Sequence, residues 1–140
     1  MQRFDRSRFV AFGVLPAINA IALLLHGLAL STHGTDGSGR AVPAIAALAI
    51  ICLLCTLSAA IKRGRDLGLH AGLTLLAFWF SLALGPCLFL YIGYLVFAKS
   101  KPKADAFGPP PFQPNIGTWL WSFLNLVWPW FVAVAAARIM

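Results

Sequence analysis

Few residues in this sequence have types and spacings that could do chemistry. Cys52 and Cys55 are spaced C-x-x-C in an apolar run, and residues three apart on a helix share a face. Such a pair could bind a metal or form a redox couple. A zinc site needs four ligands in a tetrahedral array, and only Cys87 and His26 are plausible additions. We therefore expect the cysteines to pack between helices, with no metal, cofactor or disulfide framework.

Few residues in the sequence could carry out acid–base chemistry. The three histidines lie in or beside apolar segments, at His26, His33 and His70. A polar group inside a membrane is a functional candidate by default, but no Asp or Glu lies in any apolar run. A proton relay or a general acid–base pair normally needs a carboxylate. We therefore expect that the protein is not an enzyme.

The composition places the chain in a lipid bilayer. Hydrophobic residues make up 60% of it and charged residues 11%, whereas a soluble domain carries about 25% charged residues. The net charge is +7, but no basic stripe with interleaved aromatics suggests nucleic acid. The cations form short clusters beside apolar runs, which is typical of contact with anionic lipid head groups. These clusters are Arg3/Arg6/Arg8, Lys62/Arg63/Arg65 and Lys99/Lys101/Lys103.

Four apolar segments predict an all-α transmembrane helical bundle that forms one integral membrane domain over residues 1–140. A helix of about 20 residues crosses the hydrocarbon core. A glycine-rich turn at 31–42 separates the first two segments. It lacks the Lys-Ser/Thr and the preceding strand of a phosphate loop. A proline-rich linker at 99–117 precedes the last segment. The segments are 9–30, 43–61, 69–98 and 118–137.

The third segment, 69–98, leaves two topologies open. It is too long for one upright span, and Gly85-Pro86 should break or kink it, because proline lacks the N–H that continues a helix. A hairpin that folds back there puts nine of the eleven Lys and Arg on the cytoplasmic side, and a single tilted span puts seven there. Each half of a hairpin is too short to cross fully, but a broken hairpin is tolerable inside protein. We favour the hairpin.

In the last segment, Asn125 and Pro129 form a candidate intramembrane polar site. Pro129 lies four residues after Asn125, so it removes the helical partner of the Asn125 carbonyl and should kink the helix. The Asn125 side chain can bond to a neighbouring helix, as can Asn19, Thr56 and other polar side chains in the spans.

The island Lys62, Arg63, Arg65 and Asp66 separates the second and third segments. Arg63 and Asp66 are three residues apart, so they can pair at a helix end. The simplest interpretation is that the cations hold this turn on the cytoplasmic side, with an Arg-rich N-terminus on the same side. The alternative is that the four residues contact lipid head groups or a partner protein.

These motifs resemble those of the DUF805 family of small bacterial inner-membrane proteins. Lys62, Arg63, Asp66 and Gly68 fit its loop after the second helix, and Phe107-Gly108-Pro109 fits its closing motif. Gly64, Arg65 and Ala106 depart from the family's usual residues. The resemblance covers about residues 4–111, so the Trp-rich last segment lies beyond it. It implies a bacterial cytoplasmic membrane location and no particular activity.

Together these features predict a multi-pass inner-membrane protein with a cytoplasmic N-terminus. It would act through helix–helix, lipid or partner contacts as an accessory or scaffold subunit, alone or as a homo-oligomer. The alternative is a small transporter or channel subunit that works as an oligomer. The broken third segment favours this alternative, because discontinuous helices often line substrate sites.

Overall fold

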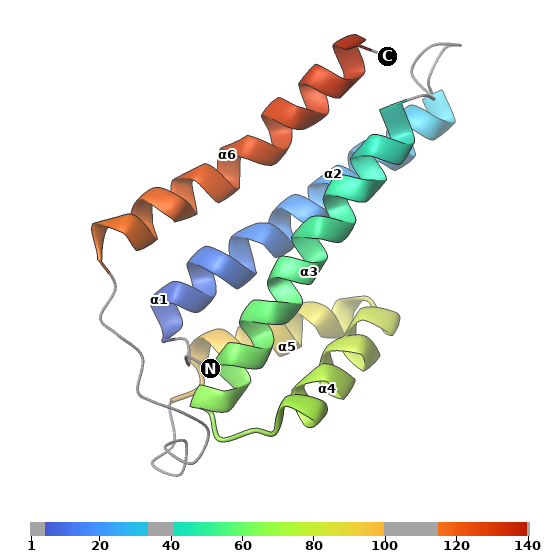
Figure 1. Ribbon diagram of the computed structural model, residues 1–140. Coiled ribbons are helices and arrows are strands. Elements are labelled where there is room, and N and C mark those ends of the chain that lie inside the picture. The colour runs from blue at the N-terminus through green and yellow to red at the C-terminus, as the bar shows by residue number, and fades with distance from the viewer. Residues whose placement is uncertain (1–4, 34–40, 100–114, 140) are drawn as a thin grey trace.

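The structure, a computed structural model, describes residues 5–33, 41–99 and 115–139, and these residues are almost entirely helical (Figure 1). The prediction of an all-α protein is confirmed. Three of the described helices are long and apolar enough to cross a membrane: Arg6–Thr32, Val42–Asp66 and Ile116–Ala135. The elements are α1 Arg6–Phe9, η1 Val10–Val14, α2 Leu15–His33, α3 Val42–Asp66, α4 Ala71–Ala83, α5 Pro86–Phe97 and α6 Ile116–Ile139.

The first span is one rod made of α1, the π-helical turn η1 and α2. Asp5 caps its start by accepting a hydrogen bond from the Arg8 N–H at 2.8 Å. The π-turn lies just before Pro16, which has no N–H to offer the Phe12 carbonyl. At this turn the Leu15 N–H donates to the Val10 carbonyl. An i→i−5 bond of this kind is the usual way for a helix to accommodate such an interruption.

The third segment is a helical hairpin, as the sequence favours. Helix α4 ends at Ala83 and α5 begins at Pro86, where a proline is tolerated because the first helical N–H needs no partner. Gly85 between them has φ +61°, a left-handed conformation that glycine adopts without a steric penalty. The hairpin runs beside the part of α3 nearer to Asp66 (Figure 1). The single tilted span is therefore excluded.

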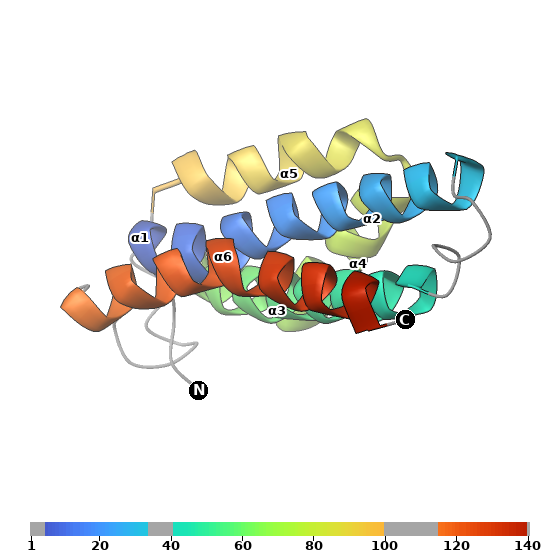
Figure 2. The same cartoon turned by 90° about the horizontal axis from the view of Figure 1, so that it is seen from above.

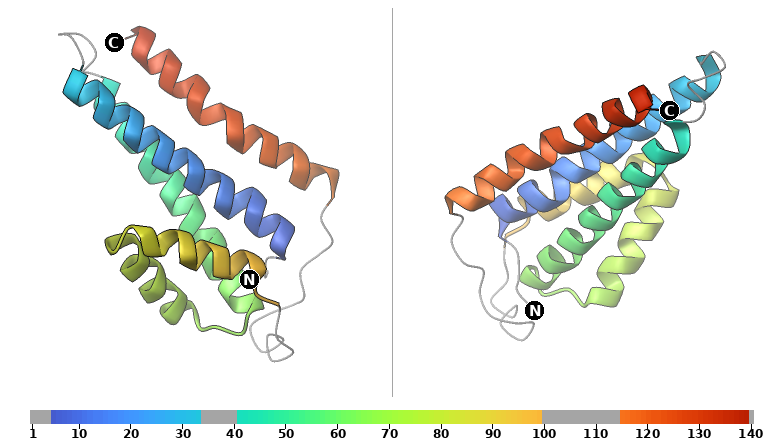
Figure 3. Two further views of the ribbon diagram at one scale, coloured as in Figure 1. Left: turned by 180° about the vertical axis from the view of Figure 1, so that it is seen from behind. Right: turned by 45° about the horizontal axis from the view of Figure 1, so that its top comes forward.

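Helix α6 and the hairpin lie on opposite sides of the α2–α3 pair (Figures 1 and 3). Seen from above, α2 runs between α5 and α6 (Figure 2). Two clusters of buried residues correspond to two halves of the molecule. The three-helix half joins α2, α3 and α6 through Ala20, Leu23, Ala41, Ile45, Leu48, Ala49, Cys52 and Ala133. The hairpin half joins α1, α3, α4 and α5 through Phe9, Ala59, Ala60, Leu67, Phe78, Leu88 and Leu95.

The second helix ends later than the sequence suggests. It continues from Ile61 to Asp66, so the charged island forms its last turns rather than the connection that follows. Gly68 has φ +75°, and its N–H donates to the Arg65 carbonyl, while the Leu69 N–H donates to the Gly64 carbonyl. This pattern is a Schellman motif, a common glycine-dependent helix end. Most of the glycine-rich turn and of the linker, with Phe107-Gly108-Pro109, lies outside the described residues.

Candidate functional site

Arg63 is the largest of the fully buried side chains among the described residues, with 1% of its surface exposed. It lies on the last turn of α3 and forms an ion pair with Asp66, which is also buried. Its Nε–H donates to the Leu95 carbonyl at 2.9 Å, and its Nη2 donates to the Ala98 carbonyl at 2.7 Å. The guanidinium group therefore joins its own helix to the end of α5.

The chemistry of helix ends explains these contacts. The last carbonyls of a helix have no intrahelical partner and carry a partial negative charge. Helix α5 ends against α3 and α1, and Arg6 in α1 donates a further hydrogen bond to the Phe97 carbonyl at 3.2 Å. Two arginines from two elements thus bind three carbonyls at one helix end. They fix the returning arm of the hairpin to the start of the first span.

Close packing fixes the other arm of the hairpin. A Cβ atom on Gly64 would collide with the Thr74 hydroxyl oxygen and lie 3.0 Å from Cγ2 of the same residue. Glycine at this position therefore lets α4 approach α3 closely. The Tyr91 hydroxyl, on α5, donates to the Thr74 carbonyl at 3.2 Å. The two arms are in this way joined to each other as well as to α3.

These positions correct part of the sequence-based expectation for the island. Arg63 and Asp66 do pair, but both are buried, so neither presents its charged group to lipid or to a partner. Lys62 and Arg65 are only partly buried, so contact with lipid head groups or a partner protein remains a prediction for these two residues. The sequence could not show the other partners of Arg63, because they are backbone carbonyls more than thirty residues away.

The second candidate site is a polar cluster between α2 and α6. The Asn19 side-chain amide donates to the Asn125 carbonyl, the carbonyl that Pro129 deprives of its helical partner. The Trp130 indole N–H donates to Asn19 Oδ1 at 3.1 Å, and that of Trp128 donates to Asn125 Oδ1 at 3.2 Å. The interhelical bond at Asn125 is therefore made by its backbone carbonyl and not, as we expected, by its side chain, which bonds within α6. Helix α6 continues through Pro129 to Ile139.

The candidate intramembrane residues do not form one site. Gly85 and Pro86 lie at the tip of the hairpin and are exposed, whereas Asn125 and Pro129 are buried on α6, on the opposite side of the α2–α3 pair (Figure 3). The broken helix and the polar cluster therefore have to be considered as separate features.

The cysteines and histidines are also dispersed. Cys52 is buried in the three-helix half, whereas Cys55 is exposed, so the two thiols do not converge on one pocket. His26 packs edge-on against Trp130, with ring centroids 6.3 Å apart. Among residues 5–33, 41–99 and 115–139, no group of three or more His, Cys, Asp or Glu side chains is arranged to hold a metal ion.

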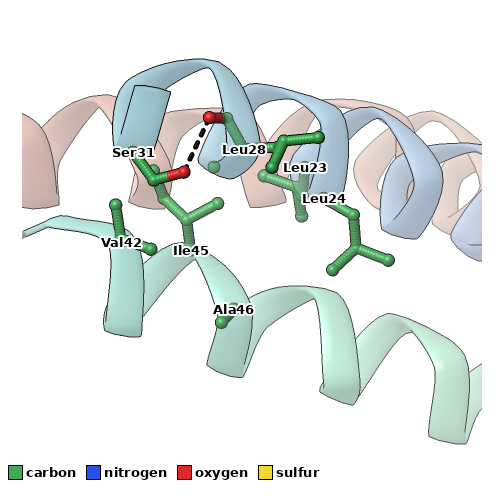
Figure 4. Close-up of a pocket in the computed structure, with 8 residues that line it drawn as sticks. Leu23, Leu24, Leu28, Ser31, Val42, Ile45 and Ala46 are labelled. Atoms are coloured by element: carbon green, nitrogen blue, oxygen red, sulfur yellow. Dashed lines mark hydrogen bonds between the residues drawn. The ribbon is translucent and has the colours of Figure 1, made fainter. Parts of the chain in front are cut away.

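Two pockets differ in character. One, of about 260 Å³, lies between α2 and α3 and is lined almost wholly by apolar side chains such as Leu24, Leu28 and Ile45 (Figure 4). The Ser31 hydroxyl beside it donates to the Leu28 carbonyl of its own helix. The other, of about 350 Å³, lies at the opposite end of the molecule and is lined by Asp5, Arg6, Ser7, Arg63 and Lys99.

Fold and site together define a class: an all-α membrane protein in which a short helical hairpin is clamped by arginine beside long apolar helices. The chain belongs to the DUF805 family, whose description is a protein of unknown function, because the family model matches residues 1–109. The match contains the arginine clamp and the hairpin, and α6 begins beyond it. No curated protein and no solved structure matches the chain.

Proposed function

We propose that this protein is a non-catalytic accessory or scaffold subunit of a bacterial inner membrane, and that it binds a membrane protein, or a second copy of itself, through the tip of its hairpin. The observation that carries the proposal is the exposed turn between α4 and α5. Residues 83–86 are all exposed, and half of the Leu84 surface is accessible.

The length of the hairpin supports a position for this turn inside the bilayer. Helix α4 has 13 residues, which give it a length of roughly 20 Å, against a hydrocarbon core of about 30 Å. The hairpin starts where α3 ends, so its tip lies partway across the core. Irregular backbone is tolerated at that depth only where protein or water covers it, because lipid tails offer no hydrogen bonds. The N–H groups of Leu84 and Gly85 are bonded within the hairpin, but the exposed turn is not covered by another described part of the chain, so a protein partner is the simplest cover for its remaining polar groups.

The side chains around the tip suit such a contact. Trp79, Phe80 and Phe89 are 54%, 70% and 64% exposed on the two arms, and aromatic side chains are frequent anchors of protein interfaces. In contrast, the buried polar side chains of the described spans all have hydrogen-bond partners within the chain. What the hairpin offers to a neighbour is therefore an apolar, aromatic surface around a short stretch of polar backbone.

Cysteine cross-linking in native membranes tests the proposal. Leu84→Cys, in a chain whose three cysteines are replaced by Ala, should give a cross-linked species when its thiol carries a maleimide-linked benzophenone. On illumination this group reacts with C–H bonds of whichever protein covers the tip, so the partner needs no cysteine. Leu24→Cys is the matched control, because Leu24 is 47% exposed and Leu84 50%, but Leu24 lies on a full-length helix. Equal cross-linking at both positions, or none at Leu84→Cys, would contradict the proposal.

A transporter or channel subunit is the second candidate, favoured by the same broken helix. A tip that lines a water-filled cavity would satisfy its backbone equally well. In that case a membrane-impermeant maleimide should label Leu84→Cys rapidly. Purified protein in liposomes should also support a solute flux that Pro86→Ala reduces. A protein-covered tip predicts slow labelling, no flux and a cross-linked partner.

The orientation of the chain is part of the proposal. The hairpin keeps the N-terminal end of α1, the end of α3 and the end of α5 together, and these ends carry most of the Lys and Arg residues. The positive-inside rule therefore favours their lying in the cytoplasm. A reporter fused after residue 104 should report the cytoplasm; a periplasmic signal would reverse the orientation.

A further inference from the structure

The polar pocket at the clamped end of the hairpin has the composition of an anion site. Its volume is about 350 Å³, and it is lined by Asp5, Arg6, Ser7, Arg63 and Lys99. These residues come from three separate parts of the chain: the start of the first span, the end of α3 and the residues just after α5. We infer that this pocket binds a phosphate group, either that of an anionic phospholipid head group or a free phosphate.

The charges in and around the pocket favour an anion. Three cationic side chains and one carboxylate line it. Asp66 does not line the pocket, but it compensates the charge of Arg63. Both carboxylates are already engaged: Asp5 accepts the Arg8 N–H and Asp66 pairs with Arg63. The Arg8 N–H is neutral, so Asp5 keeps its negative charge, and three cations with two carboxylates leave a net charge of +1. Arg6 and Lys99 are the cations outside the Arg63–Asp66 pair.

The clamp also holds like charges close together. Arg6 and Arg63 donate to the carbonyls of Phe97 and Ala98, which are adjacent residues, and Lys99 follows directly in the sequence. Asp5 and Asp66 compensate two of these three positive charges, and one positive charge is left without a carboxylate. A phosphate would compensate the remaining charge, and the clamp keeps its donors in place before it binds, which reduces the entropic cost of binding.

The roles of the side chains differ. Arg63 is 1% exposed and its guanidinium is bound to carbonyls, so it supplies positive potential at the floor of the pocket. Arg6 and Lys99 are exposed and can reach a ligand directly, and the Ser7 hydroxyl can donate a hydrogen bond. Charge-assisted bonds to phosphate are among the stronger hydrogen bonds in proteins.

The location determines which phosphate is the better candidate. Arg6 begins the first span and Lys99 follows the hairpin, so the pocket lies where a span leaves the hydrocarbon core. Phospholipid phosphates are concentrated at that depth. The inference does not depend on a partner at the hairpin tip, which is at the other end of the hairpin.

The test uses the full-length protein in a neutral detergent. Native mass spectrometry would compare retention of phosphatidylglycerol with that of phosphatidylcholine, and a thermal-shift titration would use inorganic phosphate. The variants are Arg6→Gln, Lys99→Gln and the double variant. Arg65→Gln is the control, because Arg65 is a partly exposed cation outside the pocket. Lys99→Gln separates a loss of binding from a loss of folding: Lys99 is exposed beyond the end of α5, so its replacement should leave the fold intact.

We expect phosphatidylglycerol to be retained, and the double variant to bind it about tenfold more weakly, which corresponds to about 1.4 kcal/mol. Arg65→Gln should bind normally. If inorganic phosphate stabilises the protein with the same dependence on Arg6 and Lys99, and phosphatidylglycerol is not preferred, the ligand is a free phosphate. If neither probe binds, or if Arg65→Gln weakens binding as much as the double variant, the inference is overturned.

Discussion

The two halves of the molecule hold their helices together by different means. In the three-helix half, small residues such as Ala20, Ala49 and Ala133 are buried between long helices, and close packing of small residues is the usual basis of helix association in membranes. In the hairpin half, short helices end against other helices, and Arg63, which pairs with Asp66, donates to two carbonyls at the end of α5. Arg6 and Arg63 thus attach the hairpin at its base, beside the start of the first span.

Of the substitutions that test this difference, replacement of Arg63 should lower the free energy of unfolding most. Arg63→Met leaves Asp66 buried without its partner and leaves the carbonyls of Leu95 and Ala98 without their donor. Breaking a buried ion pair in this way costs about 3–5 kcal/mol. We expect the free energy of unfolding, measured by steric trapping in bicelles, to fall by that amount.

The double variant Arg63→Met/Asp66→Leu is the control for this prediction. It removes the uncompensated carboxylate together with the arginine, so part of the lost stability should return. A loss below about 1 kcal/mol for Arg63→Met alone would show that the hairpin half does not depend on the clamp.

Gly64→Ala should have the second-largest effect on stability, because it pushes the hairpin away from α3 without changing any charge. The added Cβ would collide with the Thr74 hydroxyl, and overpacking a tight contact costs about 1–3 kcal/mol. The thermal unfolding temperature in detergent should fall. Thr74→Ala in the same chain removes the colliding atoms and should restore part of it.

Gly72→Ala is a matched control on α4. A Cβ there meets nothing within 4 Å, so the change should be neutral or stabilising by about 0.5–1 kcal/mol, the usual helix preference for alanine. Equal losses from the two glycine substitutions would remove the argument for a close α3–α4 contact.

Asn19→Leu tests the three-helix half. It removes the donor to the Asn125 carbonyl and the acceptor of the Trp130 indole, and interhelical hydrogen bonds in membranes contribute about 0.6 kcal/mol on average and rarely more than about 1.7. We expect a loss of about 1–2 kcal/mol. In a Pro129→Ala background the Asn125 carbonyl regains a helical donor, so the loss should be smaller. An undiminished loss would show that Pro129 is not the reason for the bond.

Most of the architecture follows from the sequence, but the clamp does not. Hydropathy, the break at Gly85-Pro86 and the Lys/Arg distribution predict the long helices and the hairpin, because each is a local property of the chain. The link between Pro129 and the Asn125 carbonyl is equally local. The burial of Arg63 depends on where the end of α5 comes to rest, and this is a tertiary property. A charged residue near a helix end has the same sequence pattern whether it faces lipid or a carbonyl.

Thr56→Val should have the smallest effect, and it tests where the two halves meet. The Thr56 hydroxyl is bonded to the Gly13 carbonyl in the π-turn at 3.1 Å and to the Cys52 carbonyl of its own helix at 3.0 Å. Valine keeps the shape and loses only the hydroxyl, so the unfolding free energy should fall by about 0.6 kcal/mol. Thr32→Val is the control, because that exposed hydroxyl bonds only carbonyls of its own helix, and it should change nothing measurable. A loss as large as that of Arg63→Met would mean that the π-turn contact, rather than the arginine clamp, holds the hairpin half to the rest of the molecule.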